Sequence, residues 1–387
     1  MIERQLKTRI LKLISNIPSV AILGARQAGK TTLAKMIMPE LKKETLYLDL
    51  ENPVDIVKFE NAVPFISANQ EKCLIIDEVQ RKPELFPILR SMIDQHRKPG
   101  RFLLLGSASP NLLKLSSETL AGRIVYTELT PFNALEIPQD APTSRHWIYG
   151  GFPEPFLMQD DEIRQEWFNS FLITYIERDL RLLGLSPTSM NILKFVTMLA
   201  HSHGQLINRS TFARSLDVSV NSISSYLHYL ENTFFIRNLP PFHKNLKKRL
   251  VKSPKIYVRD TGLLHHLLRI KDYNTLIGHP ILGNSWEGYV IEQIISVLGN
   301  KFEYSFYRSQ DGSECDLVIS EKFTPIAAVE IKFSSAPKKS KGLTVALQDI
   351  QAPQNFIIVP DCAAAWPLAE NLTVCNLKQF FQLLQLS

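Results

Sequence analysis

Residues 24–32, which read GARQAGKTT, are the first stretch of the chain whose residue types and spacing point to chemistry. They fit the pattern G-x-x-x-x-G-K-[ST], in which glycines let the backbone curl so that its N–H groups surround phosphate oxygens. Lys30 can reach the β- and γ-phosphates of a nucleotide, and the Thr31 hydroxyl can ligate Mg²⁺. We expect nucleotide contacts from the whole loop, which comprises Gly24, Ala25, Arg26, Gln27, Ala28, Gly29, Lys30, Thr31 and Thr32.

The segments on either side of this loop support that interpretation. Residues 19–23 (SVAIL) are apolar and rich in β-branched residues, so they predict a buried strand. Leu33, Met36 and Ile37 recur at helical spacing, and Pro39 ends the predicted helix. A chance glycine turn is the alternative, but a strand before the loop and a helix after it favour phosphate binding.

A pair of carboxylates at the end of a later strand would complete the site. Residues 73–80 (CLIIDEVQ) predict an apolar strand that ends in Asp77 and Glu78. Asp77 would hold the magnesium ion through water, and Glu78 would polarise the attacking water. A solvated strand end is the alternative. Lys30 and Asp77 are 47 positions apart, which leaves room for one more strand and helix, and residues 45–50 (TLYLDL) predict that strand.

Two further polar positions could take part in hydrolysis. Residues 101–109 (RFLLLGSAS) predict a third strand, which is apolar and stops at small polar residues, and Ser107 or Ser109 could sense the γ-phosphate or simply form the turn. Arg123 follows a glycine in the stretch LAGRIVYTEL. It could reach the nucleotide of a neighbouring subunit and stabilise transition-state charge, or it could be an ordinary surface arginine in a salt bridge.

Length and composition limit the class of protein. The 387 residues are too many for one ordinary core and predict two or three domains. No stretch reaches the roughly 20 apolar residues of a membrane helix, and the N-terminus has no long apolar region of a secretory signal. The four cysteines are scattered without a C-x-x-C pair, so we expect a reduced, cytoplasmic protein with no zinc site or disulfide framework. The net charge of +6 permits an anionic partner.

The middle of the chain predicts helices and a nucleic-acid-binding module. Residues 150–158 (GGFPEPFLM) suit a domain boundary, and the helix predicted after them would be a lid or connector. Its Arg178 could reach the nucleotide or belong to a solvated face. Residues 189–236 show three helical periods with a short helix, a tight turn and a further helix, which is typical of a helix-turn-helix.

Several residues of this module could contact DNA. Segments 235–242 and 254–260 could pair as a wing, and the run between them is basic. Packing against protein is the alternative, because winged helices often serve that purpose and charge runs are usually solvated loops. The candidate nucleic-acid contacts are Asn221, Ser222 and Ser225 of the second helix and the cations Lys244, Lys247, Lys248, Arg249, Lys252 and Lys255.

The C-terminal part contains a second set of residues with the spacing of a metal-dependent nuclease. Asp316 lies in the predicted strand 314–320, and Glu330 and Lys332 lie two apart in the predicted strand 326–334, so they share one face. Asp316 and Glu330 would ligate Mg²⁺, Lys332 would orient or deprotonate water, and Glu287 could be a further ligand. The alternatives are a turn for Asp316, a capping box with Asn284 for Glu287, and a simple ion pair for Glu330 and Lys332.

The first 130 residues resemble the AAA+ class of P-loop ATPases, and nearly the full chain resembles a prokaryotic group of AAA+ ATPases that carry an uncharacterised C-terminal domain of the PD-(D/E)XK nuclease-like type. The stretches that carry this resemblance are GARQAGKTT, LIIDEVQ, GSAS, LAGR, GGFPEP, YIERDL, PKIYVRDTGLL, SWEGYVIEQ, ECDLVI and VEIKFS. One departure is that Asp316 follows Cys315 rather than proline. The resemblance implies ATP binding and hydrolysis and leaves cleavage of nucleic acid open.

We therefore predict an α/β protein with an N-terminal AAA+-like P-loop NTPase sheet at 1–130, a helical lid or connector at 131–188, a winged-helix-like module at 189–270 and a restriction-endonuclease-like α/β domain at 271–387. The predicted function is Mg²⁺-dependent ATP hydrolysis, with Lys30, Glu78 and Arg123 as catalytic residues. The expected partners are nucleic acid, DNA first, and further copies of the chain through Arg123, but no membrane. The alternatives are an ATP-switched DNA- or protein-binding adaptor with an inactive nuclease fold, and an active ATP-regulated DNA nuclease.

Overall fold

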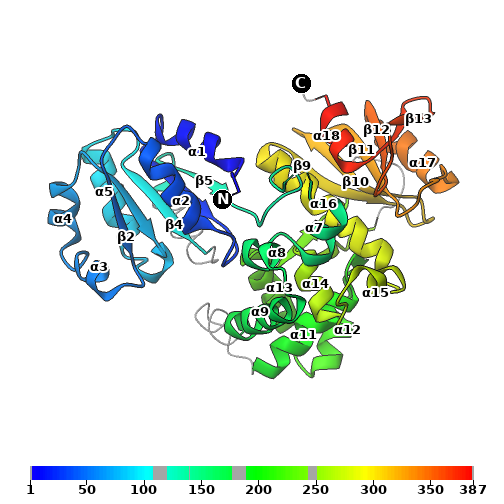
Figure 1. The fold of residues 1–387 in the computed structure, drawn as a ribbon, viewed down its shortest axis with the longest axis horizontal. Coiled ribbons are helices and arrows are strands. Elements are labelled where there is room, and N and C mark those ends of the chain that lie inside the picture. Colours follow the sequence, from blue (N-terminus) through cyan, green and yellow to red (C-terminus); the bar gives the residue numbers. More distant parts are fainter. Residues whose placement is uncertain (1, 108–119, 139, 177–188, 243–250, 386–387) are drawn as a thin grey trace.

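The structure is a computed structural model that describes residues 2–107, 120–138, 140–176, 189–242 and 251–385. The chain forms two lobes, which Figure 1 shows side by side. The smaller lobe contains the N-terminal elements α1 (Leu6–Ile14), β1 (Ser19–Leu23), α2 (Lys30–Ile37), β2 (Thr45–Asp49), α3 (Pro53–Val57), α4 (Ala62–Ala68), β3 (Cys73–Asp77), α5 (Leu85–Gln95), β4 (Phe102–Gly106) and β5 (Ile124–Glu128). All later elements belong to the larger lobe.

The smaller lobe is a parallel sheet with helices on both faces. Its strand order is β2-β3-β4-β1-β5, and every neighbouring pair is parallel. Val20 and Ile22 of β1 pack with α1 and α2, whereas Ala21 and Leu23 pack with α4 and α5. Strands covered on both faces read as continuous apolar runs, which is why the sequence predicted β1, β3 and β4 at these positions. The carboxyl ends of the five strands meet at one edge.

The middle of the chain is mainly helical and carries a small antiparallel sheet. Its elements are α7 (Thr143–Tyr149), α8 (Pro153–Leu157), α9 (Asp161–Thr174), α11 (Ser189–His201), β6 (Gln205–Leu206), α12 (Arg209–Leu216), α13 (Val220–Asn232), β7 (Ile236–Leu239), β8 (Lys255–Val258), α14 (Thr261–Leu267) and α15 (Tyr273–Ile277). Asp217, with φ of 52°, turns the chain after α12, and the Ser219 hydroxyl caps α13 by accepting from the Ser222 N–H. The strands pair in the order β6-β8-β7.

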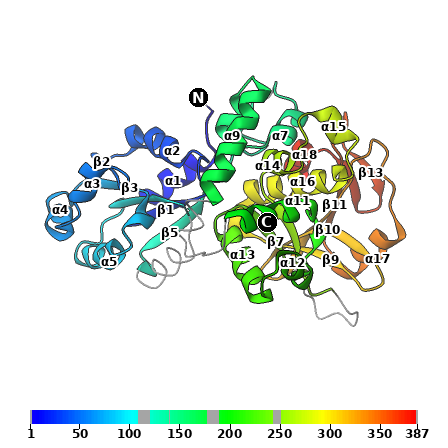
Figure 2. The same ribbon diagram turned by 90° about the horizontal axis from the view of Figure 1, so that it is seen from below.

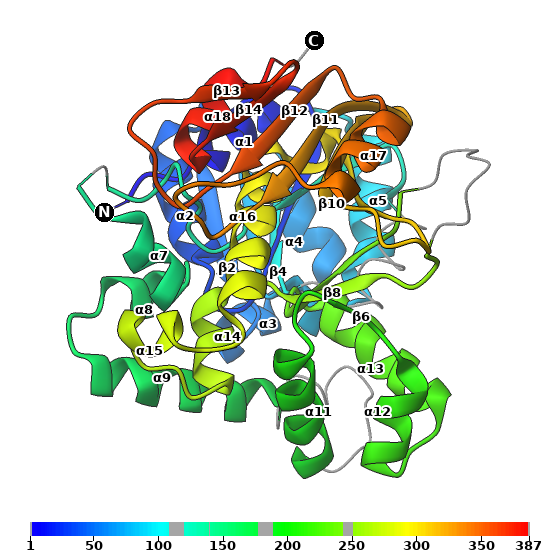
Figure 3. The same cartoon turned by 90° about the vertical axis from the view of Figure 1, so that its right-hand side faces the viewer.

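The C-terminal part is a mixed sheet between helices. It comprises α16 (Leu282–Leu298), β9 (Glu303–Arg308), β10 (Glu314–Glu321), β11 (Thr324–Ile331), α17 (Lys341–Ile350), β12 (Gln354–Ile358), β13 (Trp366–Ala369), β14 (Leu372–Cys375) and α18 (Leu377–Leu383). The strand order is β13-β14-β12-β11-β10-β9, with β11 parallel to β12 and antiparallel to β10. Leu317 and Val329 pack with α16, whereas Val318 and Ala328 pack with α17. Figure 3 shows this sheet at the end of the larger lobe opposite α11, α12 and α13.

One apolar core runs through the larger lobe, from Ala134 to Leu384, and includes Ala25 and Ala28 of the glycine loop. The segment that begins at Gly150 is part of this packing. The Gly151 N–H donates to a carboxylate oxygen of Asp260 at 2.8 Å, and a Cβ on Gly151 would lie 2.4 Å from the Phe132 carbonyl oxygen. Gly151 therefore allows close packing of this segment against Phe132 and Asp260. The predicted domain limits are not tested by these contacts and stay a prediction.

None of the four cysteines forms a disulfide. Within the ranges that the structure describes, no helix combines the length and the apolar character needed to span a membrane.

The close contact between α14 and α7 generates a stability prediction. A Cβ on Gly262 would lie 2.1 Å from the Tyr149 carbonyl oxygen, so Gly262→Ala should lower the free energy of unfolding by about 3 kcal/mol. Gly283, near the start of α16, has no atom within 4 Å of its added Cβ, and Gly283→Ala should be neutral or stabilising by about 1 kcal/mol. Denaturant unfolding followed by tryptophan fluorescence reports on the larger lobe, which holds all four tryptophans. Equal stability of the two variants would contradict the prediction.

Candidate functional site

The glycine loop lies between β1 and α2 at the carboxyl edge of the parallel sheet. Gln27 and Gly29 have φ values of 58° and 95°. Gly24 has no room for a side chain, because a Cβ there would lie 2.3 Å from the Leu129 carbonyl oxygen. The buried Lys30 ammonium donates to the carbonyl oxygens of Gly24 at 3.1 Å and Ala25 at 2.9 Å. The loop thus curls around its own lysine, and the predicted contacts of the loop with phosphate remain a prediction.

Thr31 and Asp77 meet at the start of α2 and the end of β3. The Thr31 hydroxyl donates to Asp77 Oδ2 at 2.6 Å, and Asp77 is only 3% exposed. The Tyr47 hydroxyl donates to the same oxygen at 2.6 Å. Burial and the hydrogen bond to Asp77 raise the pKa of Tyr47, so the phenol stays a donor. An alcohol oxygen beside a carboxylate oxygen is a donor set that suits Mg²⁺.

Glu78 and Ser107 follow the ends of β3 and β4. Burial raises the pKa of Glu78, and the nearby Lys30 ammonium opposes this effect. The Glu78 carboxylate accepts a hydrogen bond from the Gln80 amide. The Ser107 hydroxyl is buried and, within the described residues, has no hydrogen-bond partner. Ser109 lies outside the described residues.

A cleft between the lobes extends from the loop to α8 and α9, and Figure 2 shows α9 beside the smaller lobe. The cleft holds roughly 1360 Å³ including its open mouth. From the smaller lobe it is lined by Arg26, Gln27, Gly29, Lys30, Thr31, Thr32, Glu51 and Glu78, and from the larger lobe by Pro153, Glu154, Trp167, Ser170, Phe171, Thr174 and Tyr175.

Three aromatic rings at spacing i, i+4 and i+8 follow α9 along this cleft. The rings of Trp167 and Phe171 stack at 5.3 Å and 10°, and those of Phe171 and Tyr175 at 6.1 Å and 4°. The Trp167 indole N–H donates to Glu154 at 2.6 Å. The sequence predicted this helical face as a lid or connector. The spacing of its aromatic residues was the available signal that this face lines a cleft. Arg178, the proposed nucleotide contact, lies outside the described residues.

Arg4 is a supporting residue that the sequence analysis missed. Its guanidinium donates to the carbonyl oxygens of Ala28 at 2.9 Å and Thr130 at 2.6 Å, and it pairs with Glu136 at 3.1 Å. The side chain thereby fixes the glycine loop to the segment after β5. No local pattern marks this arginine, because all three partners are distant in the sequence.

Arg123 lies away from the cleft of its own chain. Its guanidinium pairs with both carboxylate oxygens of Asp94, at 2.6 and 2.8 Å, and is not among the residues that line the cleft. This geometry fits the alternative of a surface salt bridge, and the action on a neighbouring subunit remains a prediction.

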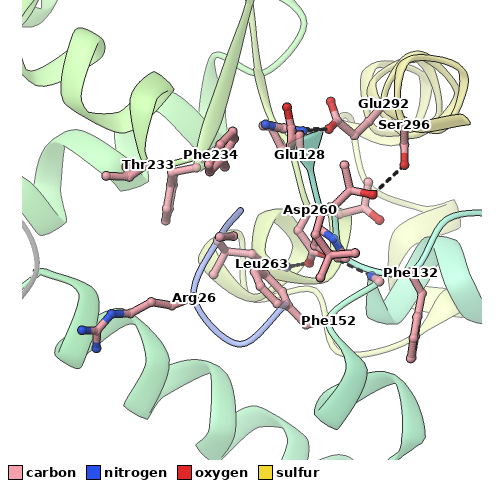
Figure 4. Close-up of a pocket in the computed structure, with 18 of the residues that line it drawn as sticks. Arg26, Glu128, Phe132, Phe152, Thr233, Phe234, Asp260, Leu263, Glu292 and Ser296 are labelled. Carbon is pink, nitrogen blue, oxygen red and sulfur yellow. Dashed lines mark hydrogen bonds and ion pairs between the residues drawn. The ribbon is translucent and has the colours of Figure 1, made fainter. Parts of the chain in front are cut away.

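A second cavity, of about 1100 Å³ including the open space at its mouth, lies between the lobes, behind the glycine loop (Figure 4). Arg26, Ser107 and Glu128 line it from the smaller lobe. At its wall the Arg259 guanidinium pairs with Glu128 and with Glu292 of α16. Burial lowers the pKa of Arg259, but these two carboxylates outweigh it and raise the pKa overall. This buried ion-pair network joins the end of β5 to the larger lobe.

The candidate nucleic-acid contacts are only partly described. Asn221, Ser225 and Lys252 are exposed, whereas Ser222 is half-buried and its hydroxyl is bonded to Ser219 at 2.9 Å. The prediction that Lys255 contacts nucleic acid is wrong, because this residue is only 3% exposed and cannot meet nucleic acid at the surface. Its strand β8 is the central strand of the small sheet, and its side chain turns toward carboxylates of the C-terminal part. Lys244, Lys247, Lys248 and Arg249 lie outside the described residues.

The carboxylates predicted in the C-terminal part lie together. Lys332 pairs with Glu330 at 2.6 Å, and the Ile331 N–H donates to Asp316 Oδ2 at 2.8 Å. Glu287 lies in α16. The N-terminus of this described helix has no side-chain cap, so Glu287 and Asn284 do not form the capping box that was the alternative. Burial raises the pKa of Asp316, and Glu287 and Glu330 raise it further.

Lys255 also belongs to this cluster, which the sequence analysis did not foresee. Its ammonium lies 2.9 Å from Glu287, 2.7 Å from Glu314 and 3.8 Å from Asp316. The Tyr257 hydroxyl donates to Glu287. Within the described part of the chain, no group of three or more His, Cys, Asp or Glu side chains has a geometry for a metal ion.

Comparisons with known proteins agree with the smaller lobe's fold. Residues 16–137 match a family described as "AAA domain", residues 142–274 a "Domain of unknown function (DUF8612)" and residues 282–380 a "Domain of unknown function (DUF4143)". "Uncharacterized protein Mb2031c" of Mycobacterium bovis and "Uncharacterized protein Rv2008c" of Mycobacterium tuberculosis are each 38% identical over 99% of this chain and 87% of their own length. This chain belongs to their family.

The first region is thus an AAA-type P-loop ATPase domain, which suggests ATP binding and hydrolysis. Among solved structures, the Walker-type ATPase PABY2304 of Pyrococcus abyssi is 14% identical, with 69% of this chain and 96% of that chain covered at a TM-score of 0.49. A single-site variant of RuvB from Thermotoga maritima is 22% identical, with 62% and 90% covered at a TM-score of 0.34. Likeness at this level says nothing about what this chain binds. The nuclease-like assignment of the C-terminal part stays a prediction.

Proposed function

We propose that the chain binds ATP with Mg²⁺ and hydrolyses it in the cleft between the glycine loop and α9. The observation that carries this proposal is the convergence of Lys30, Thr31, Asp77 and Glu78 at the carboxyl ends of β1 and β3. Lys30 would exchange its contacts with the Gly24 and Ala25 carbonyls for phosphate oxygens. Thr31 and Asp77 would hold Mg²⁺, with Tyr47 keeping the Asp77 carboxylate in place. The bound ion would supply positive charge beside the phosphates.

Glu78 is the residue that would activate the attacking water. It directly follows Asp77, lines the cleft and has a pKa raised by burial. A carboxylate with a raised pKa is a stronger base, which suits it to take a proton from water. Ser107 lines the second cavity, behind the loop, and its buried hydroxyl lacks a partner within the described residues; from there it would sense the γ-phosphate. Arg26 faces both cavities and could meet phosphate charge there.

The aromatic wall of α9 would receive the nucleobase. Trp167 and Phe171 face the same cleft as Thr32, at the side of Pro153 and Glu154. Stacking on an aromatic ring contributes about 1–3 kcal/mol per base. The triphosphate and the base would then contact different lobes, so ATP would hold the two lobes together.

The larger lobe would act as an ATP-switched binding adaptor for nucleic acid. The exposed Asn221, Ser225 and Lys252 and the basic run before β8 supply polar and positive groups for phosphates. The alternative is an ATP-regulated nuclease with Asp316, Glu330 and Lys332 at its centre. The ammonium of Lys255 within that cluster favours the adaptor, because it takes up carboxylates that a metal would need.

The first prediction about function concerns the phosphate site. Lys30→Ala should weaken ATP binding at least about 100-fold, because it removes the buried ammonium that would contact the β- and γ-phosphates. Glu78→Gln should bind ATP as the wild type does and lose about 100-fold or more in turnover. A fluorescent ATP analogue measures binding, and steady-state phosphate release measures turnover. Lys42→Ala, at an exposed lysine of the same lobe, is the control and should change neither. A wild-type chain that neither binds nor hydrolyses ATP refutes the proposed function.

The second prediction concerns the base. Trp167→Ala should weaken ATP binding about 5- to 100-fold and leave tripolyphosphate binding unchanged, because only the base would meet the indole. Trp167→Phe retains an aromatic ring and should stay close to the wild type. Isothermal titration calorimetry measures both ligands. A loss of affinity that is equal for ATP and tripolyphosphate would show that the base lies elsewhere.

The third prediction tests action across a subunit interface. If Arg123 serves a neighbouring nucleotide, Arg123→Ala should lower turnover about 1000-fold without changing ATP affinity. Mixing it with Lys30→Ala should restore part of the turnover, since the second variant retains Arg123 and the first retains an intact loop. Asp94→Ala removes the partner of Arg123 and is the control for loss of the salt bridge alone. Unchanged turnover in Arg123→Ala would leave this arginine as a surface residue.

A further inference from the structure

A buried lysine lies inside the carboxylate cluster of the C-terminal part. Lys255 comes from β8 of the small sheet, whereas its partners come from α16 and β10. Only 4% of its side chain is exposed. Its ammonium contacts Glu287 and Glu314 at hydrogen-bond distance and lies 3.8 Å from Asp316. Three carboxylates from two elements of the C-terminal part therefore surround one cation from another sheet.

We propose that the ammonium of Lys255 takes the cation position of this cluster, so that the folded chain does not bind a divalent ion there. An ion held by Glu287 and Asp316 would need oxygens at about 2.0–2.6 Å from its centre. The ammonium already lies 2.9 and 3.8 Å from oxygens of these two residues, and so it occupies the space between them. Glu287 and Asp316, two of the three residues predicted as metal ligands, therefore do not fit a metal ion between them in this arrangement.

The balance of charge supports the same inference. Glu287, Glu314, Asp316 and Glu330 face the ammonium groups of Lys255 and Lys332. Glu330 is 6% exposed, and its second oxygen has no hydrogen-bond partner within the described ranges, so the cluster retains an unused ligand atom. Without Lys255, at least one carboxylate would lose its buried counter-ion, which is unfavourable unless another cation enters. A divalent ion is the class of ligand that would replace the lysine.

The position of Lys255 also ties two parts of the larger lobe together. The small sheet provides the cation, and the C-terminal sheet and α16 provide the carboxylates. Metal entry would therefore require β8 to withdraw its lysine. This inference concerns a site apart from the nucleotide cleft, so it can fail while the proposed ATPase activity holds.

The test compares Mn²⁺ binding with and without the lysine, in full-length chains free of nucleotide. All variants carry Asp77→Asn, which removes the metal-ligating carboxylate of the nucleotide cleft. Free Mn²⁺ is measured by electron paramagnetic resonance, and thermal unfolding is recorded with and without Mn²⁺. The chain with Lys255 should bind no Mn²⁺ stoichiometrically. The Lys255→Met variant should bind one Mn²⁺ per chain, with an affinity at least about tenfold higher than any residual affinity of the chain that retains Lys255. The Tm of this variant should rise when Mn²⁺ is added.

Two further variants make the result specific. Lys252→Met, at an exposed lysine three positions earlier, should behave as the chain with Lys255 does. Asp316→Asn added to Lys255→Met should remove the Mn²⁺ binding. If Lys255→Met does not fold, Lys255→Met with Glu314→Gln keeps the net charge of the cluster and both expected ligands, Glu287 and Asp316, and serves in its place.

Either of two results would overturn the proposal. One is stoichiometric Mn²⁺ binding by the chain with Lys255 that is lost with Asp316→Asn, since metal would then bind beside the lysine. The other is a folded Lys255→Met variant that takes up no Mn²⁺, since the cluster would then not be a cation position.

Discussion

The hydrogen bond between Thr31 and Asp77 is the contact on which the candidate ATPase site depends. It joins the first turn of α2 to the end of β3, although β4 lies between β1 and β3 in the sheet. A parallel sheet brings the carboxyl ends of all its strands to one edge, and so the first turn of the helix that follows β1 can reach a carboxylate at the end of β3. Tyr47 of β2 reaches the same oxygen from the other side. The chemistry of the site thus follows from the strand order.

The candidate nucleotide cleft is lined by residues of both lobes, which makes the junction between the lobes part of the candidate site. Trp167, Phe171 and Tyr175 of α9 form one wall, and the Tyr175 ring stacks on Phe235 at the start of the small sheet, at 5.1 Å and 19°. Arg4 holds the loop from behind. Ala25 and Ala28 of the loop belong to the apolar core of the larger lobe. A change in the loop on nucleotide binding would therefore act directly on the packing of that core.

Local patterns in the sequence were sufficient where the chemistry is local. The loop at 24–32 and the Asp77–Glu78 pair are contiguous stretches, and the alternation of a strand sufficed to bring Glu330 and Lys332 together. Tyr47, Arg4 and Lys255 could not be found in this way, because each acts on residues far away in the chain. Lys255 was grouped with a basic run because composition records its charge and not its burial. The partner of Arg123 could not be predicted either, because Asp94 is 29 positions away in the sequence.

Strand β8 and Arg259, the residue after it, take part in two groups of ion pairs, one at the carboxylate cluster and one at Glu128 and Glu292. Lys255, Tyr257 and Arg259 are two residues apart, so they share one face of the extended chain. All three meet carboxylates of α16, with Lys255 and Tyr257 at Glu287 and Arg259 at Glu292. Arg259 also pairs with Glu128, at the end of β5 of the ATPase domain. Lys255 and Arg259 are separated by roughly 13 Å of extended chain. Arg259 and Lys255 are thus held at the two ends of one short extended segment, the first by Glu128 and Glu292 and the second by Glu287 and Glu314. The edge of the ATPase domain and the carboxylate cluster are therefore joined by ion pairs to one face of a single extended segment.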